Sequence, residues 1–153
     1  MKHLKLYIQE GLKLGSSKIN QYTEHPQTRD ELRDIIEDRL REDEDADMND
    51  IDVSEIEDMS GLFVMLNPHN IEIDQWDVSR VKDMSYMFSR CENFNADLSK
   101  WNVSRVTDMR SMFHNCRKFD CDLNDWNVSK VNNMSRIFYR SKLENHPPKW
   151  FKE

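Results

Sequence analysis

Apolar side chains recur along the chain with a fixed spacing of 25 residues from about residue 47 onward. One pattern, an apolar residue followed by Asp or Asn, Val and Ser and then by Asp/Asn-Met, begins at residues 51, 76, 101 and 126. A later position is always phenylalanine, at Phe63, Phe88, Phe113 and Phe138. One repeat cannot bury such a face alone, whereas stacked neighbours can. The pattern therefore predicts a stack of about four 25-residue turns.

Each repeat divides into a predicted strand and a predicted helix. In the third repeat, residues 97–101 favour a short strand, and a turn follows it. Asp108 then stands at the N-cap of a two-turn helix over about 109–116, since aspartate side chains accept hydrogen bonds from the first helical turn. Met109, Met112 and Phe113 share one face of that helix. The expected fold class is an α/β repeat with a short strand and a short helix in each turn.

The motif W-D/N-V-S-x-V-x-D/N-M-S-x-M-F resembles the BspA-like leucine-rich repeats of Mycoplasma surface lipoproteins, over roughly residues 47–140. The resemblance implies a short leucine-rich-repeat solenoid that serves surface adhesion or protein interaction, with no catalytic residues to carry over. The chain departs from the usual layout because it has only about four repeats and no lipoprotein or secretion signal. A cytoplasmic or virion-associated protein is therefore expected rather than a classically secreted one.

The repeats are flanked by predicted caps. Residues 28–46 combine a capping helix, which begins with a Thr-x-x-Glu capping box at Thr28, with an acidic turn. This helix is expected to cover the first repeat, because terminal units must hide the exposed core. The array and its C-terminal cap occupy residues 47–153, where Trp150 or Phe151 is expected to fold over the last repeat.

The first residues predict a separate element. Residues 1–15 indicate an amphipathic docking helix, and residues 16–27 indicate a linker. The apolar face of the docking helix consists of Leu4, Tyr7, Ile8 and Leu12. Residues 1–10 also resemble the capsid-targeting leaders of internal head proteins in large tailed phages, which are cut after a site such as Ile8-Gln9-Glu10. An anchoring helix and a virion leader both stay open.

Composition narrows the classes of function. The formal net charge is −7 without a basic stripe, which argues against nucleic-acid binding. Three cysteines do not indicate a disulfide framework, and no apolar run is long enough for a transmembrane segment. No nucleophile motif or carboxylate pair stands apart from the repeat. We therefore expect no enzyme activity and no cofactor.

Two metal-site hypotheses fail on spacing. The acidic run after residue 42 is similar to the start of a calcium loop, but Met48 stands where that loop needs glycine. His114, Cys116 and Cys121 lack the paired motifs of a zinc site, and packing in the core is the favoured role of both cysteines. No metal is therefore expected.

Columns of equivalent residues supply the candidate partner surface. A basic column is either paired with nearby aspartates or open to an acidic partner, and it consists of Arg80, Arg105 and Lys130. Exposed positions that differ between repeats complete the candidate surface, and these are Tyr86, Ser111 and Arg136.

Two further columns each have a structural and a functional interpretation. For the acidic column, the favoured interpretation is a solvated edge that prevents aggregation, and the alternative is a site for a cation or a basic partner. This column consists of Asp47, Glu72, Asp97 and Asp122. The tryptophan column favours stacking in the core over a platform for a glycan or peptide, and it consists of Trp76, Trp101 and Trp126.

The sequence thus predicts a non-catalytic leucine-rich-repeat module that binds an unidentified protein and is anchored to a larger assembly or surface by its N-terminal helix. The alternative is a phage virion structural or internal cargo protein targeted by residues 1–10. A third hypothesis, an antagonist of a basic host protein, rests on net acidity alone.

Overall fold

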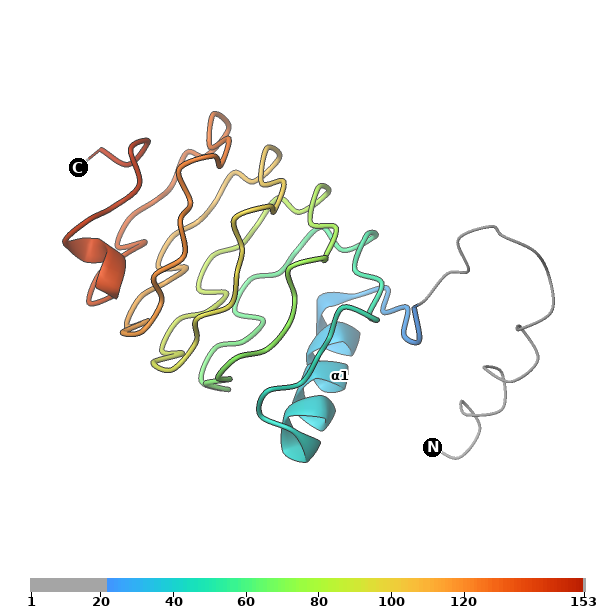
Figure 1. The fold of residues 1–153 in the computed structure, drawn as a ribbon. Helices are drawn as coiled ribbons and strands as arrows, with labels where there is room; N and C mark the ends of the chain where they lie inside the picture. Colours follow the sequence, from blue (N-terminus) through green and yellow to red (C-terminus); the bar gives the residue numbers. More distant parts are fainter. Residues whose placement is uncertain (1–21, 153) are drawn as a thin grey trace.

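The computed structural model describes residues 22–152, which contain one α-helix and one short 3-10 helix. Helix α1 spans Arg29–Glu42, and η2 spans Lys142–Glu144. The four repeats lie side by side in chain order as a stack, with α1 beside the first (Figure 1), and they span 51–75, 76–100, 101–125 and 126–150. The docking helix predicted over residues 1–15 lies outside the described residues.

Helix α1 confirms the helix predicted to follow Thr28. The Thr28 hydroxyl accepts a hydrogen bond from the Glu31 N–H at 3.2 Å, as an N-cap does. The Glu31 carboxylate reaches back to the Gln27 N–H at 2.7 Å, one residue before the partner expected in a capping box. Leu32 and Ile36 are fully buried and join the same core as the repeats. The helix therefore closes the apolar end of the stack at the first repeat.

The helix predicted in each repeat is wrong. The equivalent segments are successions of turns, here called the turn segments, and they span 58–66, 83–91, 108–116 and 133–141. Alternate N–H groups donate to a carbonyl 24 residues later, in the next repeat, as Phe88 does to Met112 at 3.0 Å. The N–H groups between them close turns onto the third residue back, as Met87 does onto Met84 at 3.2 Å. An α-helix needs those donors for carbonyls four residues back, so it cannot form.

Left-handed residues also exclude a helix from the turn segments. Two residues in each segment have a positive φ, which interrupts a right-handed helix. At the first such position φ is 60° at Gly61, 58° at Tyr86, 53° at Ser111 and 57° at Arg136. For a residue other than glycine this conformation costs about 1–2 kcal/mol. Hydrogen bonds to the neighbouring repeats offset that strain.

The strand predicted near residues 97–101 is also wrong, and with it the α/β leucine-rich-repeat solenoid. Among the described residues, pairing between repeats is limited to isolated parallel bridges, such as Asp83 with Asp108, and no sheet forms. Asp and Asn side chains interrupt the extended backbone by accepting from the N–H two residues on. Asp97 accepts from Ser99 at 2.9 Å, and Asp108, the predicted N-cap, accepts from Arg110 at 2.8 Å.

The core confirms the apolar register of the repeats. The equivalent phenylalanine rings stack from one repeat to the next with centroids 5.1–6.0 Å apart, and these are Phe63, Phe88, Phe113 and Phe138. Trp76, Trp101 and Trp126 are each only 4% exposed, so they belong to the core and form no platform. Each indole N–H donates to a backbone carbonyl 28 residues earlier, at 2.8–3.0 Å.

Trp150 and Phe151 cover the last repeat, as predicted. The Trp150 ring packs on Phe138 with centroids 6.0 Å apart, and its indole N–H donates to the Leu123 carbonyl at 2.7 Å. Phe151 meets the Phe138 ring edge-on at 5.3 Å. The Trp150 indole therefore takes the place that the Trp126 indole holds one repeat earlier.

Candidate binding surface

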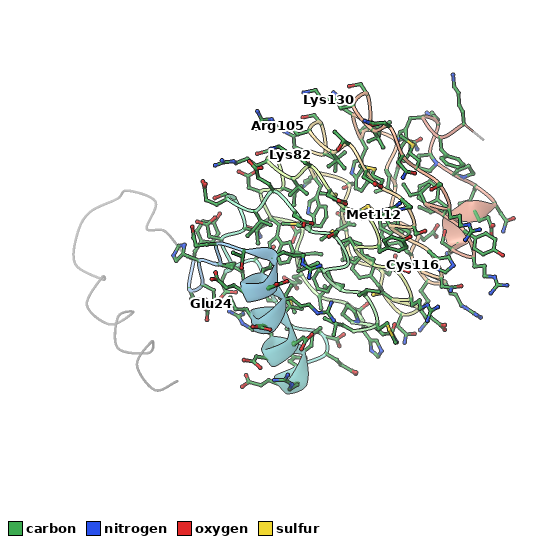
Figure 2. The ribbon with its side chains drawn as sticks, turned by 180° about the vertical axis from the view of Figure 1, so that it is seen from behind. Glu24, Lys82, Arg105, Met112, Cys116 and Lys130 are labelled. Atoms are coloured by element: carbon green, nitrogen blue, oxygen red, sulfur yellow. The ribbon has the colours of Figure 1, made fainter. Side chains whose placement is uncertain are left out.

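The predicted basic column lies along one edge of the stack. Figure 2 shows Arg105 and Lys130 there in a row with Lys82 of the second repeat. Arg80 pairs with an acidic residue of the preceding repeat rather than with a nearby aspartate, because its guanidinium lies 2.6 Å from the Glu55 carboxylate. The charge of Arg80 is therefore neutralised within the protein.

The column is unpaired only at its C-terminal end, because Arg80 is paired. Lys82, which lies beside the column, is paired with Glu57 at 2.6 Å. Arg105 and Lys130 are exposed, and neither forms an ion pair with any residue between 22 and 152. Isolated surface charges attract a partner weakly and are screened by salt. The column alone is a poor binding site.

The second predicted set occupies the first left-handed position of the turn segments. Ser111 is only 5% exposed, so its assignment to the partner surface is wrong. Tyr86 and Arg136 are exposed. They belong to a surface formed by the turn segments, here called the turn face. Its accessible basic and aromatic members are Tyr86, Arg90, Arg110, His114, Arg136, Tyr139 and Arg140, and its accessible aspartates are Asp58, Asp83 and Asp108.

Aromatic rings on the turn face lie against cationic side chains. The Arg110 guanidinium is 5.3 Å from the centroid of the Tyr86 ring, and Arg140 lies at the same distance from Tyr139. The His114 imidazole stacks on the Tyr139 ring. The two ring centroids are 5.6 Å apart, and the ring planes are 6° from parallel. Each exposed cation–π contact contributes about 0.5–1 kcal/mol. Together they hold the rings in place before any partner binds.

Sequence patterning missed most of this face. Arg90 and Arg140 share one register position, and His114 and Tyr139 share the one before it. Both positions change residue type from repeat to repeat, whereas the core positions keep theirs. That variation is the sequence signal by which the turn face could have been identified. The helix predicted there concealed it, because a helix distributes these positions differently between core and surface.

Positive charge on the turn face is only partly neutralised, because Arg110 lies 3.7 Å from the Asp108 carboxylate. Arg90, Arg136 and Arg140 form no ion pair with a residue between 22 and 152. Burial lowers the pKa of His114, because the imidazolium form loses contact with water, and the three arginine charges lower it further. The imidazole also lies 3.3 Å from the Ser89 hydroxyl. The turn face therefore carries three arginine charges without an ion-pair partner among residues 22–152, on an acidic protein.

Removing two of these charges is expected to raise the pKa of His114. In R90Q/R140Q the imidazolium loses two repelling neighbours, while burial, the larger cause, remains. Titration of the ring protons by NMR measures the change, and R105Q/K130Q on the basic column is the control with equal charge loss. An unchanged pKa of His114 in R90Q/R140Q would show that the arginines do not act on it.

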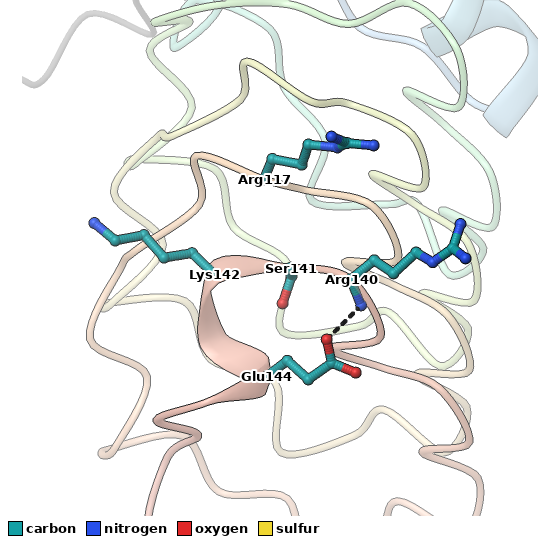
Figure 3. Close-up of a pocket in the computed structure, with 5 residues that line it drawn as sticks. All are labelled: Arg117, Arg140, Ser141, Lys142 and Glu144. Atoms are coloured by element: carbon teal, nitrogen blue, oxygen red, sulfur yellow. Dashed lines mark hydrogen bonds between the residues drawn. The ribbon is translucent and has the colours of Figure 1, made fainter.

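A depression of about 420 Å³ lies at the C-terminal end of the turn face and is open to solvent (Figure 3). Its lining residues are Arg117, Arg140, Ser141, Lys142 and Glu144. The Glu144 carboxylate accepts a hydrogen bond from the backbone N–H of Arg140 at 3.0 Å. Among residues 22–152, no ion pair or cation–π contact joins the turn face to the basic column.

Burial disfavours the thiolate form of Cys91, Cys116 and Cys121. Burial raises the pKa of Cys91 to about 12 and shifts that of Cys116 in the same direction. Burial raises the pKa of Cys121 to about 11. No group of three or more His, Cys, Asp or Glu side chains in the described part of the chain is placed to hold a metal ion.

The acidic column is explained by local turns. Asp47, Asp97 and Asp122 each accept a hydrogen bond at 2.9 Å from the backbone N–H two residues on. Glu72 pairs through its backbone with Asp47 in an isolated parallel bridge. The three aspartate carboxylates stabilise turns, which accounts for their recurrence without a ligand.

Comparison with known proteins places most of the chain in one family. No curated protein and no solved structure matches it. Among residues 22–152, no helix has the length and apolar character needed to cross a membrane. A family described as Mycoplasma protein of unknown function, DUF285, matches residues 32–150, which include the turn face and all four repeats. The chain therefore belongs to the DUF285 family of Mycoplasma proteins.

Proposed function

We propose that the chain is a non-catalytic protein-binding module whose contact surface is the turn face. The observation that carries this proposal is the pairing of exposed tyrosine rings with arginines. Tyr86 and Tyr139 are 42% and 43% exposed, and a guanidinium lies over each ring. Tyrosine and arginine are enriched among the residues that dominate binding energy at protein interfaces.

The scaffold beneath this face supports the same proposal. The turn segments are joined to their neighbours by backbone hydrogen bonds, and Phe88 and Phe113 beneath them are fully buried. A surface that is already ordered loses little conformational entropy when a partner binds. The regular stack thus presents a preformed surface in place of a mobile loop.

Charge on the turn face favours an acidic partner. The protein carries a net charge of −7, yet the guanidinium groups of Arg90, Arg136 and Arg140 form no ion pair with a carboxylate among residues 22–152. A local charge opposite to the net charge orients an incoming partner and speeds association. The likeness of the motif to BspA-like surface proteins, which act in adhesion or protein interaction, supports the same class of function.

Burial of the thiols argues against a cysteine nucleophile. A nucleophilic cysteine needs a lowered pKa, whereas burial raises the pKa of Cys91 to about 12. Anchoring to a larger assembly would depend on residues 1–15, which lie outside the described residues.

A charge-matched pair of variants tests the proposal. R90Q/R110Q/Y139S removes two charges and one tyrosine from the turn face, and R105Q/K130Q/Y22S removes the same set elsewhere. A partner is first identified by cross-linking in the native source and then purified for calorimetry. We expect the turn-face variant to bind at least about tenfold more weakly, as loss of interface hot spots does, while the control binds as the parent does.

Equal melting temperatures of the two variants and the parent show that each still folds. Loss of binding in R105Q/K130Q/Y22S alone would assign the contact to the basic column and overturn the turn face. Unchanged binding in both variants would reject the proposed contact surface altogether.

A further inference from the structure

The hydrogen bonds between the turn segments, here called the turn ladder, all run in one direction. N–H groups of one repeat donate to carbonyls of the next, as Met109, Ser111 and Phe113 do to the fourth repeat at 2.9–3.0 Å. A ladder of this kind has unmatched carbonyls at its first repeat and unmatched N–H groups at its last. Its two edges therefore need opposite kinds of partner.

Helix α1 closes the first edge. The carbonyls of Ser60, Leu62 and Val64 are the ones that a preceding repeat would use, by the register of the later repeats. Arg29 donates to the Ser60 carbonyl at 2.8 Å. Arg33 donates to the Leu62 carbonyl at 3.0 Å and to the Val64 carbonyl at 3.4 Å. Guanidinium donors thus replace the missing N–H groups.

The last edge is closed at one position only. The N–H groups of Met134, Arg136, Phe138 and Arg140 occupy the donor register of the turn ladder. The Arg140 N–H is bound by the Glu144 carboxylate at 3.0 Å (Figure 3). The other three have no acceptor among residues 22–152. This donor edge is the counterpart of the edge that α1 closes.

We propose that the donor edge binds an acidic segment of a partner protein, a proposal that rests on the proposed function and specifies its partner. Carboxylates of that segment accept hydrogen bonds from the N–H groups of Met134, Arg136 and Phe138. The same segment pairs with the guanidinium groups of Arg136 and Arg140, which lie beside these N–H groups in the chain and are exposed.

The chemistry of the edge selects carboxylates. Every free group on it is a donor, and the one N–H already satisfied is satisfied by the carboxylate of Glu144. Hydrogen bonds between N–H groups and carboxylates are stronger than those between neutral groups. Neighbouring backbone N–H groups next to guanidinium groups also attract anions. An acidic segment therefore complements the donor edge as α1 complements the acceptor edge.

A second copy of the chain does not fit the donor edge. Its matching carbonyls, in residues 58–66, are already bound by Arg29 and Arg33. In the repeat register, its residues 45–51 would also have to lie where residues 145–151 of the first copy already lie. The donor edge can therefore bind a single peptide segment but not a second copy of the stack.

Amide hydrogen exchange, with a capped hexaglutamate peptide as the probe, tests this proposal on the full chain. Without peptide, the amides of Met134, Arg136 and Phe138 are expected to exchange quickly, while the matched amides of Met109, Ser111 and Phe113 are protected. Addition of the peptide is expected to slow exchange at the first three and shift their NMR signals. R136Q/R140Q is expected to weaken this binding about tenfold, and R105Q/K130Q to leave it near the parent value.

Slow exchange of the three amides in the protein alone would overturn the proposal, because an acceptor would already be in place. Equal weakening by R136Q/R140Q and R105Q/K130Q would also overturn it, since general attraction between charges would then explain the binding. The turn-face variant R90Q/R110Q/Y139S keeps the N–H groups of the donor edge and both of its arginines, Arg136 and Arg140. A failure at the edge is thus separable from a failure of the proposed function.

Discussion

Replacing Phe113 with alanine is expected to lower the free energy of unfolding by about 3–5 kcal/mol, the range for large aromatic side chains lost from a core. Phe113 is fully buried at the centre of the stack. The centroid of its ring is 4.2 Å from the centroid of the Phe119 ring. The ring centroids of Phe88 and Phe138 lie at 5.8 Å and 6.0 Å. Its truncation leaves a cavity that touches three repeats, so no single repeat can relax to fill it.

Urea unfolding followed by tryptophan fluorescence measures this loss, because the tryptophan column lies in the same core. Tyr139→Ala is the control, since that ring is 43% exposed, and it should cost no more than about 1 kcal/mol. A loss below about 1 kcal/mol for Phe113→Ala would contradict the packing described above. Separate transitions by different probes would indicate that the repeats unfold independently.

Replacing Arg33 with alanine is expected to cost about 2–3 kcal/mol, the second largest effect. Arg33 donates to the carbonyls of Gly61, Leu62 and Val64 at 2.9, 3.0 and 3.4 Å. Hydrogen bonds to charged groups contribute about 1.5–3 kcal/mol each. The total is smaller than their sum because the Arg33 side chain is 25% exposed, and water can reach the carbonyls once it is gone.

Arg41→Ala is the matched control for Arg33→Ala. Arg41 belongs to the same helix and lies 3.8 Å from the Glu37 carboxylate, but it makes no hydrogen bond to a repeat carbonyl in the described structure. Its loss should cost less than about 0.5 kcal/mol, as for other exposed ion pairs. Comparable losses in the two variants would mean that the charge of α1 stabilises the stack, and that closure of the turn ladder does not.

The hydrogen bonds of Arg33 are relevant to function as well as to the free energy of unfolding. The same guanidinium chemistry that closes the first edge of the turn ladder makes the last edge, with its free N–H groups, chemically different from it. A protein that closed both edges would have no preferred end for a partner. The asymmetry gives the stack one end suited to an acidic segment.

Much of the core could be predicted from the sequence. Burial of equivalent apolar residues is a property of the repeat itself, so Phe88, Phe113 and the tryptophan column lie in the core as expected. Helix α1 could be predicted too, because the Thr28 N-cap and the spacing of its apolar residues act within one segment. The covering of the last repeat by Trp150 followed from the need to hide a terminal core.

Less of the candidate site could be predicted from the sequence. Tyr86 and Arg136 were recognised as exposed, but Ser111 at the same register position is buried. The basic column was found, yet its ion pair between Arg80 and Glu55 joins residues 25 positions apart. Exposure and pairing of such residues depend on the neighbouring repeats, which a local pattern does not describe.

The sequence by itself determined the period of the repeat, the residues of its core and the capping helix, because each depends on apolar spacing or on contacts within a few residues. Only the tertiary structure decided the backbone of the turn segments. Their N–H groups had two sets of acceptors available, carbonyls four residues back for a helix or 24 residues ahead in the next repeat. Stacking of the repeats brings the distant carbonyls within 2.8–3.4 Å, and the helix is lost. The same stacking creates the turn face and the two unlike edges, since hydrogen bonds between the turn segments have a direction that no single repeat contains.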